Sequence, residues 1–292
     1  MVYSALTEAH MDRMAEGFRD AYGIELEYQR LVGPDLTARY AAEAEAGAFA
    51  ADVALLGSSP DATAQDWISK GWVEPLADVG LPAYDEFPAD FKSANTAVIS
   101  LQPWGIIYNT DMVDADAVPT SFEDLTGEVF SGQILIADPR ATNAYLPIYS
   151  AIQEAYGDEW FAAMTGQDLR WFEGGTPASQ ALAAGEGSVM ALGVSTQAFG
   201  LQAAGAPIEI AIPDLTAGVE THVALTVADD APHPAAARLF AQWLMTPEGA
   251  EFANDIDGVL SAYSEGLPAE YQRPAPDTWL TPEQLLALFG LS

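Results

Sequence analysis

The chain has 292 residues, half of them hydrophobic, with a formal net charge of −33 at pH 7 and no cysteine. A chain of this length can bury a large core and form two domains, while the lack of cysteine excludes disulfides, thiol catalysis and thiolate metal sites. The acidity excludes general nucleic-acid binding, which needs a basic surface, and no apolar run reaches the roughly 20 residues that span a membrane.

The charge is unevenly composed, with 43 acidic residues against ten basic ones. The acidic residues are spread along the sequence, as in a solvated surface, and lysine occurs only at Lys70 and Lys92. This pattern favours a protein that works in high salt, where screening relieves self-repulsion. A calcium-rich exterior is the alternative, but no segment has the spacing of a calcium loop.

The first part of the chain alternates between strand and helix patterns. A strand is predicted at Val2–Ala5, and a helix follows that is capped by Thr7 and ended by Gly23. Alternating Ile24, Leu26 and Tyr28 predict a second strand. We further predict a helix from Asp35 to Ala46, a strand at 52–56 and a helix at 62–70. The alternation predicts an α/β fold with a largely parallel sheet.

The same alternation continues to the end of the chain. Thr176 and Ser195 are predicted N-caps, because each precedes a helical pattern that a glycine ends. The predicted strands are 104–109, 134–137, 188–192, 208–212 and 219–228. The predicted helices are 147–156, 176–185, 195–205, 234–245 and 247–254, and a last one follows the capping box Thr281–Gln284.

The most informative segment follows the strand at 134–137. The strand breaks at Asp138-Pro139, and the chain turns through Arg140, Thr142 and Asn143 toward a helix. Strand ends that lead into helix N-termini collect backbone N–H groups that bind anions, and these three side chains can also donate to an oxyanion. The segment therefore predicts an anion site. Alternatively, Arg140 pairs with a carboxylate and holds the loop.

Other strand ends also carry small polar residues, namely Ser4, Ser58 and Ser59, Thr176, and Ser195. Ligands of open α/β sheets bind beyond the carboxyl ends of the strands, although each of these residues can also be an ordinary helix cap. Catalysis has little support, because the three histidines form no metal-spaced pair and no nucleophile elbow or phosphate loop is present. We therefore predict a binding protein, with no enzyme activity and no cofactor.

Several short motifs occur in an order that is characteristic of one family. They are Val2-Tyr3-Ser4-Ala5, Tyr22-Gly23-Ile24, Ala51-Asp52-Val53, Lys70–Leu76, Pro103-Trp104-Gly105, Tyr108-Asn109-Thr110, Pro119–Leu125 and Trp243–Gly249. With them, residues 2–255 resemble the periplasmic solute-binding proteins of ABC transporters (extracellular solute-binding family 1, type II fold). Within this family the chain is most similar to the ferric-ion-binding proteins and their relatives for small anions.

The resemblance implies two α/β lobes joined by two crossing strands that close on a solute. Lobe 1 would comprise residues 1–100 and 225–270, and lobe 2 residues 101–224 and 271–292, with hinge strands near 97–107 and 219–228. It also implies a periplasmic or extracellular location, with any signal peptide or lipid anchor outside this sequence. The partners would be an ABC permease and a small solute, bound by a monomer.

The resemblance also bears on the solute. The iron ligands of the family fall at Thr7, Gly57 and the segment Val194-Ser195-Thr196, so the iron site is missing. The anion loop of the family matches Arg140-Ala141-Thr142-Asn143. We expect an organic phosphate, a phosphonate or a carboxylate, bound by Ser4, Ser58, Ser59, Arg140, Ala141, Thr142, Asn143, Thr176 and Ser195. Trp104 would line the cleft or belong to the hinge core. A cation or metal bound through carboxylates such as Glu220, and a role in presenting solute to a membrane sensor, are alternatives.

We predict that the stability of the protein rises with salt, because screening weakens the repulsion among 43 acidic residues that only ten basic ones offset. The melting temperature should be higher in molar sodium chloride than in dilute buffer. An unchanged melting temperature would contradict the high-salt interpretation.

Overall fold

The computed structural model describes residues 1–31, 33–57, 60–141, 143–273 and 278–291. The chain divides into two compact units that share the strands β5 (Ala97–Asn109) and β11 (Gly218–Thr226). Unit 1 comprises Met1–Leu101 and Glu220–Glu265, and unit 2 comprises Gln102–Val219 and Gly266–Ser292. The fold therefore has the two α/β lobes and two crossing strands that were expected. The second segment of unit 1 was expected at residues 225–270, and in the structure it is Glu220–Glu265. Its first boundary lies within β11, where no loop marks it.

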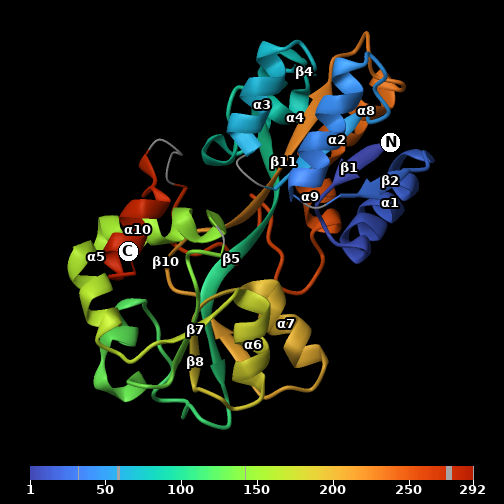
Figure 1. Cartoon of the computed structure of the whole chain (residues 1–292). Coiled ribbons are helices and arrows are strands. Elements are labelled where there is room, and N and C mark those ends of the chain that lie inside the picture. Colours follow the sequence, from blue (N-terminus) through green and yellow to red (C-terminus); the bar gives the residue numbers. More distant parts are fainter. Residues whose placement is uncertain (32, 58–59, 142, 274–277, 292) are drawn as a thin grey trace. The chain divides into compact units, whose positions relative to one another are not determined.

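Unit 1 is built on a sheet in the order β2-β1-β3-β11, with β4 also paired to β11 (Figure 1). Strands β1 (Val2–Ser4), β2 (Tyr28–Arg30) and β3 (Val53–Leu56) are parallel, while β11 is antiparallel to β3. Strand β4 is Val73–Glu74. The helices are α1 (Glu8–Tyr22), α2 (Gly33–Glu45), α3 (Pro60–Ser69), α4 (Pro82–Glu86), α8 (Pro234–Leu244) and α9 (Pro247–Ala253).

The strands of unit 1 place alternate side chains in two hydrophobic cores. Val53 and Leu55 face a core with Met11, Phe18 and Phe240. Ala54 and Leu56 face a core with Leu36, Tyr40 and Trp67. The period of two along a buried strand thus packs α1 and α8 on one face of the sheet and α2 and α3 on the other.

Unit 2 has a sheet in the order β5-β8-β6-β7, with β9 paired to β5. Strands β6 (Ile134–Ala137), β7 (Arg170–Phe172) and β8 (Val189–Val194) are parallel, and β5 is antiparallel to β8. Strand β9 is Ile208–Ala211, and β10 (Leu215–Thr216) pairs with β12 (Glu270–Tyr271). The helices are α5 (Leu146–Thr165), α6 (Gly175–Ala183), α7 (Ser195–Ala203) and α10 (Pro282–Leu288). Figure 1 shows α6 and α7 packed along β8.

Several predicted elements differ from the structure. The second strand is Tyr28–Arg30, and Ile24 and Leu26 precede it while packing against the core. The helix expected to end at Tyr156 continues to Thr165 after a break at Gly157, where φ is 70°. Strand β7 was not predicted, because Arg170–Phe172 is too short to show a period. The capping box at Thr281 is confirmed.

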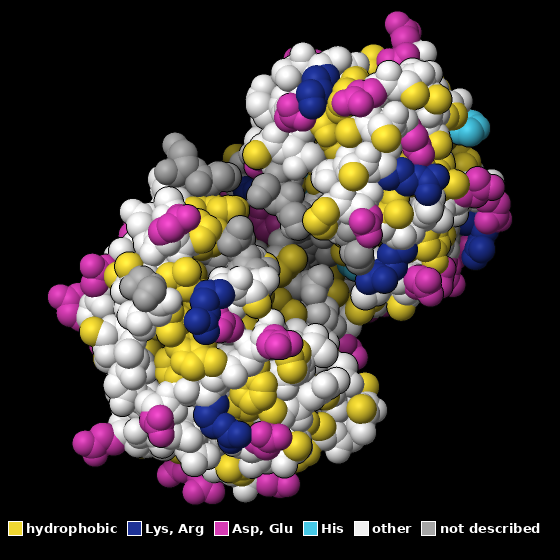
Figure 2. Space-filling model, in the orientation of Figure 1, with side chains coloured by type: hydrophobic (Ala, Val, Ile, Leu, Met, Phe, Trp, Pro, Cys, Tyr) yellow, Lys and Arg dark blue, Asp and Glu magenta, His cyan; other side chains and the backbone are white. Residues whose placement is uncertain are grey.

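The surface of each unit carries scattered charge. Figure 2 shows acidic side chains dispersed over the visible face among neutral ones, with the few basic side chains beside them. Among the described residues, no helix is long and apolar enough to cross a membrane.

A glycine allows close packing between two helices of unit 1. A Cβ atom at Gly17 in α1 would lie 2.8 Å from Cζ2 of Trp243 and closer still to the ring of Phe252 in α9. Gly200 in α7 is the matched control, because a Cβ atom there would have no neighbour within 4 Å.

We predict that Gly17→Ala destabilises the protein by about 1–2 kcal/mol, since overpacking costs roughly 1–3 kcal/mol and outweighs the gain in helix propensity. Gly200→Ala should instead stabilise α7 by about 0.5–1 kcal/mol. Urea unfolding of both variants measures the two effects. Equal shifts of the two midpoints in the same direction would show that Gly17 is not needed for packing.

Candidate functional site

The carboxyl ends of three parallel strands meet at one edge of the unit 2 sheet. Strands β6, β7 and β8 lie side by side in the order β7-β6-β8. The segment 138–145 follows β6, 173–177 follows β7, and 194–197 lies at the end of β8. Trp104 of β5 pairs with Val194 at the end of β8 and so lies at the same edge. We call these three segments with Trp104 the unit 2 edge. It gathers Arg140, Thr176 and Ser195, which are far apart in the sequence.

Arg140 is held by a carboxylate from its own loop. Its Nε lies 2.9 Å from Oδ1 and 3.0 Å from Oδ2 of Asp138, and its Nη2 also donates to Oδ2. The ion pair holds the pKa of the Asp138 carboxyl below its usual value. The side chain of Arg140 is 55% exposed. Arg140 is therefore paired with a carboxylate of its own loop, and Asp138 offsets the charge of Arg140.

The prediction that Thr176 caps α6 is wrong. The N-cap is Gly174, two residues before Thr176, and the helix begins at Gly175. Thr176 lies exposed in the first turn. A Cβ atom at Gly175 would lie 2.8 Å from Nε2 of Gln197 and 2.9 Å from the hydroxyl of Tyr145, so the two glycines let the N-terminus of α6 pack closely at the unit 2 edge.

Ser195 is likewise not an N-cap. It is the first residue of α7, it is 1% exposed, and Val194 occupies the cap position. The side chain of Gln197 stabilises this turn by accepting a hydrogen bond of 3.2 Å from the backbone N–H of Val194. The hydroxyl of Thr196, which is half-buried, donates to Oε1 of Gln102 at 2.6 Å.

Trp104 belongs to the core but keeps an unused donor. Its side chain packs on Tyr145 with ring centroids 4.7 Å apart, and both residues are at most 5% exposed. Burial raises the pKa of Tyr145 to about 12. The indole Nε1 of Trp104 is buried without a hydrogen-bond partner among the described residues. Sequence reasoning missed Tyr145 and Gln197, although Gln197 lies two residues after the predicted cap Ser195 and Tyr145 lies two residues before the predicted helix at 147–156.

Unit 1 has a corresponding edge, where the parallel strands β2, β1 and β3 end. We call residues 4–7, 30–31 and 57 the unit 1 edge. Ser4 is fully buried, and its hydroxyl accepts a hydrogen bond of 3.1 Å from the N–H of Leu6, so it shapes the turn into α1. Ser58, Ser59 and Thr142 lie outside the described residues, and so does the side chain of Asn143. Ala141 is exposed, and its N–H donates to the carbonyl of Asp138.

A chain of hydrogen bonds runs inside unit 1 beside the unit 1 edge. His222 of β11 pairs with Leu56 at the end of β3. Its Nε2 lies 3.0 Å from Oε2 of Glu220, and its Nδ1 lies 2.8 Å from the hydroxyl of Thr96. That hydroxyl also lies 2.8 Å from Oδ1 of Asp61 in the first turn of α3. Glu220, the carboxylate considered for a cationic solute, is thus engaged by a buried imidazole.

Comparison with known proteins decides the family. The family model of bacterial extracellular solute-binding proteins matches residues 55–287, which is most of the chain. The chain belongs to this family. This solute-binding protein is therefore not an enzyme, and it serves an ABC transporter from a periplasmic or extracellular location. No curated protein sequence matches it.

Solved structures share its fold at low sequence identity. Iron-bound HitA from Pseudomonas aeruginosa has a TM-score of 0.72 at 17% identity, with 99% of this chain and 97% of that chain covered. An ABC-transporter substrate-binding protein from Agrobacterium tumefaciens has a TM-score of 0.74 at 18% identity, covering 100% and 93%. AfuA from Actinobacillus pleuropneumoniae with fructose-6-phosphate has a TM-score of 0.63 at 19% identity, covering 99% and 95%.

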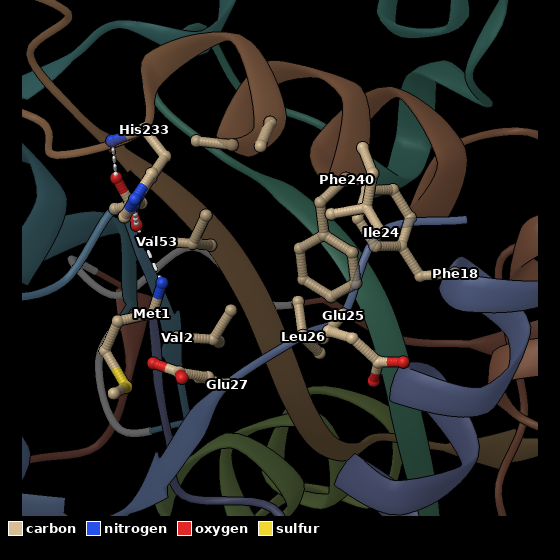
Figure 3. A pocket seen from close by; sticks show the side chains of 13 residues that line it. Met1, Val2, Phe18, Ile24, Glu25, Leu26, Glu27, Val53, His233 and Phe240 are labelled. Carbon is tan, nitrogen blue, oxygen red and sulfur yellow. Dashed lines mark hydrogen bonds and ion pairs between the residues drawn. The ribbon is translucent and has the colours of Figure 1, made fainter. Parts of the chain in front are cut away.

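A separate pocket of about 280 Å³ lies at the opposite, amino-terminal edge of the unit 1 sheet. Figure 3 shows apolar side chains such as Val53 and Phe240 in it, with Glu25 and Glu27 at its side. Asp52 accepts hydrogen bonds there from the amino group of Met1, at 2.7 Å, and from the N–H of His233, at 2.5 Å. Its place away from the strand ends makes it a poor candidate for the solute site.

The positions at which the family resemblance implies iron ligands carry no imidazole, carboxylate or phenolate. Thr7 caps α1 by accepting from the N–H of His10 at 3.3 Å, Gly57 has no side chain, and Ser195 is buried. Among the described residues, no three His, Cys, Asp or Glu side chains are placed to hold a metal ion.

We predict that this solute-binding protein does not bind ferric iron, because Thr7, Gly57 and Ser195 replace an imidazole, a carboxylate and a phenolate. Titration with ferric citrate should give no visible charge-transfer band and no rise in melting temperature. A tight, coloured complex would show that iron is the solute after all.

Proposed function

We propose that this solute-binding protein delivers a small anionic solute to an ABC permease, and that the unit 2 edge binds the anionic group. The solute would be an organic phosphate, a phosphonate or a carboxylate. The main support is the convergence of oxyanion donors at the unit 2 edge. The helices α6 and α7 begin at this edge, and the loop that carries Arg140 follows β6 at the same edge. Helix N-termini favour negative charge, and a remaining N–H of a guanidinium can make a charge-assisted hydrogen bond to an oxygen of phosphate or carboxylate.

A second observation at this edge also favours a ligand. Nε1 of Trp104 is a buried donor that no described residue satisfies. An unpaired buried donor costs roughly 1–3 kcal/mol, so such a group is retained where a ligand or water pairs with it. An oxyanion offers several lone pairs and would satisfy this donor together with backbone N–H groups.

The ion pair with Asp138 defines the part that Arg140 plays. Asp138 engages Nε and Nη2 of Arg140, while Nη1 has no partner among the described residues. Arg140 would therefore offer one fixed donor direction, with little conformational entropy left to lose on binding. This arrangement selects for the position of an oxygen atom more than for total charge.

Other properties of the chain are compatible with transport by a single copy. In the described part of the chain, the exposed large hydrophobic residues are Tyr22, Met112, Val129 and Ile212, which lie far apart in the sequence. Single exposed apolar residues are normal for a monomer, whereas an obligate interface needs a continuous patch. The fold accommodates chemically different solutes, because HitA is iron-bound and AfuA has fructose-6-phosphate bound.

We predict that Arg140→Ala weakens binding of the anionic solute about tenfold or more, because a charge-assisted hydrogen bond contributes roughly 1.5–3 kcal/mol. A thermal-shift screen over phosphonates, sugar phosphates, carboxylates and metals first identifies the solute. A ligand at 100 times its Kd adds about 2.7 kcal/mol of stability. Calorimetric titration of that ligand then compares the variants.

Arg170→Ala is the matched control. Arg170 is an exposed arginine of the same unit that pairs with Glu186 at 2.9 Å, but it stands at the start of β7, at the edge opposite the strand ends. Arg140→Lys should recover part of the affinity, because an ammonium keeps the charge without the planar fork. If Arg140→Ala and Arg170→Ala bind as tightly as the wild type, Arg140 only holds its loop. A response to metals alone would refute the anionic solute.

A further inference from the structure

A basic residue of unit 1 stands out because it lacks a carboxylate. Seven of the ten lysines and arginines form ion pairs within the described part of the chain, namely Arg13, Arg19, Arg39, Lys70, Arg140, Arg170 and Arg238. Arg30 forms none with any described residue, although the protein has 43 acidic side chains. Its terminal nitrogens Nη1 and Nη2 also have no described hydrogen-bond partner, and its side chain is exposed.

Arg30 stands at the unit 1 edge. It is the last residue of β2 and pairs in register with Ser4, the last residue of β1. Its Nε donates to the carbonyl of Leu6 at 3.1 Å, so the guanidinium is fixed over the turn that joins β1 to α1. The N-terminus of α1 begins in the same turn, and its N-cap is Thr7. A fixed guanidinium and the positive end of a 15-residue helix therefore share this turn.

The two edges differ in their charge. The guanidinium of Arg140 is offset by Asp138, whereas that of Arg30 is offset by no described carboxylate. In a protein with a net charge of −33, an uncompensated arginine at a strand-end edge creates a local attraction for anions that the rest of the surface opposes. An anion at the unit 1 edge would thus meet a charge that no described carboxylate offsets.

We propose that Arg30 is the oxyanion-binding residue of unit 1 and that it makes binding selective for negative charge. The proposal rests on the proposed function, since it takes an anionic solute as given. The ligand class is an oxyanion with two negative charges, such as a phosphonate or a phosphate monoester. Nη1 and Nη2 of Arg30 are the donors, and Nε remains on the carbonyl of Leu6.

The test is calorimetric titration of the full chain with methylphosphonate and with fructose 6-phosphate, at low and at high sodium chloride. Arg30→Gln should raise the Kd about tenfold, the effect of losing one charge-assisted hydrogen bond, and should make the Kd less dependent on salt. Arg30→Lys should restore the salt dependence but only part of the affinity. Arg19→Gln is the control, because Arg19 is an exposed arginine in the last turn of α1, away from the strand ends.

The outcomes separate this proposal from the proposed function. If the wild type binds neither probe nor any other anion, both fail. If the wild type binds a probe and Arg140→Ala weakens it, while Arg30→Gln behaves like Arg19→Gln, only the role of Arg30 is refuted. Arg30 also holds the Leu6 turn, so its loss could act through structure. In that case Arg30→Gln would lower the melting temperature and leave the salt dependence of the Kd unchanged, and this result would also overturn the proposal.

Discussion

The parallel pairing of short strands is the constraint on which the candidate site depends. In each unit three neighbouring strands run in the same direction, so the loops that follow these three strands all emerge at one edge of the sheet. Each loop then leads into a helix whose first N–H groups lack intrahelical partners. The pairing of β6 with β8 places Arg140 and Ser195 at the same edge of the sheet, although they are far apart in the sequence. The register of these strands also fixes which side chains reach that edge, because a slip by one residue would turn each side chain to the opposite face.

The scarcity of basic residues gives each of them structural meaning. On an ordinary surface an exposed arginine says little, because isolated ion pairs contribute about 0–1 kcal/mol. Here most of the few arginines form ion pairs with carboxylates, so an arginine that forms none among the described residues is informative. Arg140 is matched within its own loop, which favours a fixed donor. Arg30 is bound only to a backbone carbonyl, which leaves its charge uncompensated by described residues. The acidity that argues against nucleic-acid binding therefore supports the proposal that these arginines bind an anion.

The sequence predicted the architecture well and the site unevenly. Strand and helix periods are local, so the strand at Ile134–Ala137 and the helix capped by Thr7 could be predicted closely. The starts of two helices were predicted less well. Helix α6 is capped by Gly174 instead of Thr176. The start of α7 is supported by the side chain of Gln197, which accepts a hydrogen bond from the N–H of Val194. The ion pair of Arg140 with Asp138 was one of two readings that the sequence left open. Arg30 was missed because its position beside Ser4 results from the pairing of β1 with β2. Pairing between strands is not visible in a local sequence pattern.

The chain of hydrogen bonds inside unit 1 also could not be predicted from the sequence. Asp61, Thr96, His222 and Glu220 come from three distant segments, and no spacing in the sequence links them. Buried polar groups are costly unless they are paired, so their presence beside the unit 1 edge needs a reason. The chain ties the first turn of α3 to β11, one of the two strands that run from one unit into the other. Because His222 pairs with Leu56 at the end of β3, these hydrogen bonds lie directly beside the unit 1 edge and link α3 to the strand that borders it.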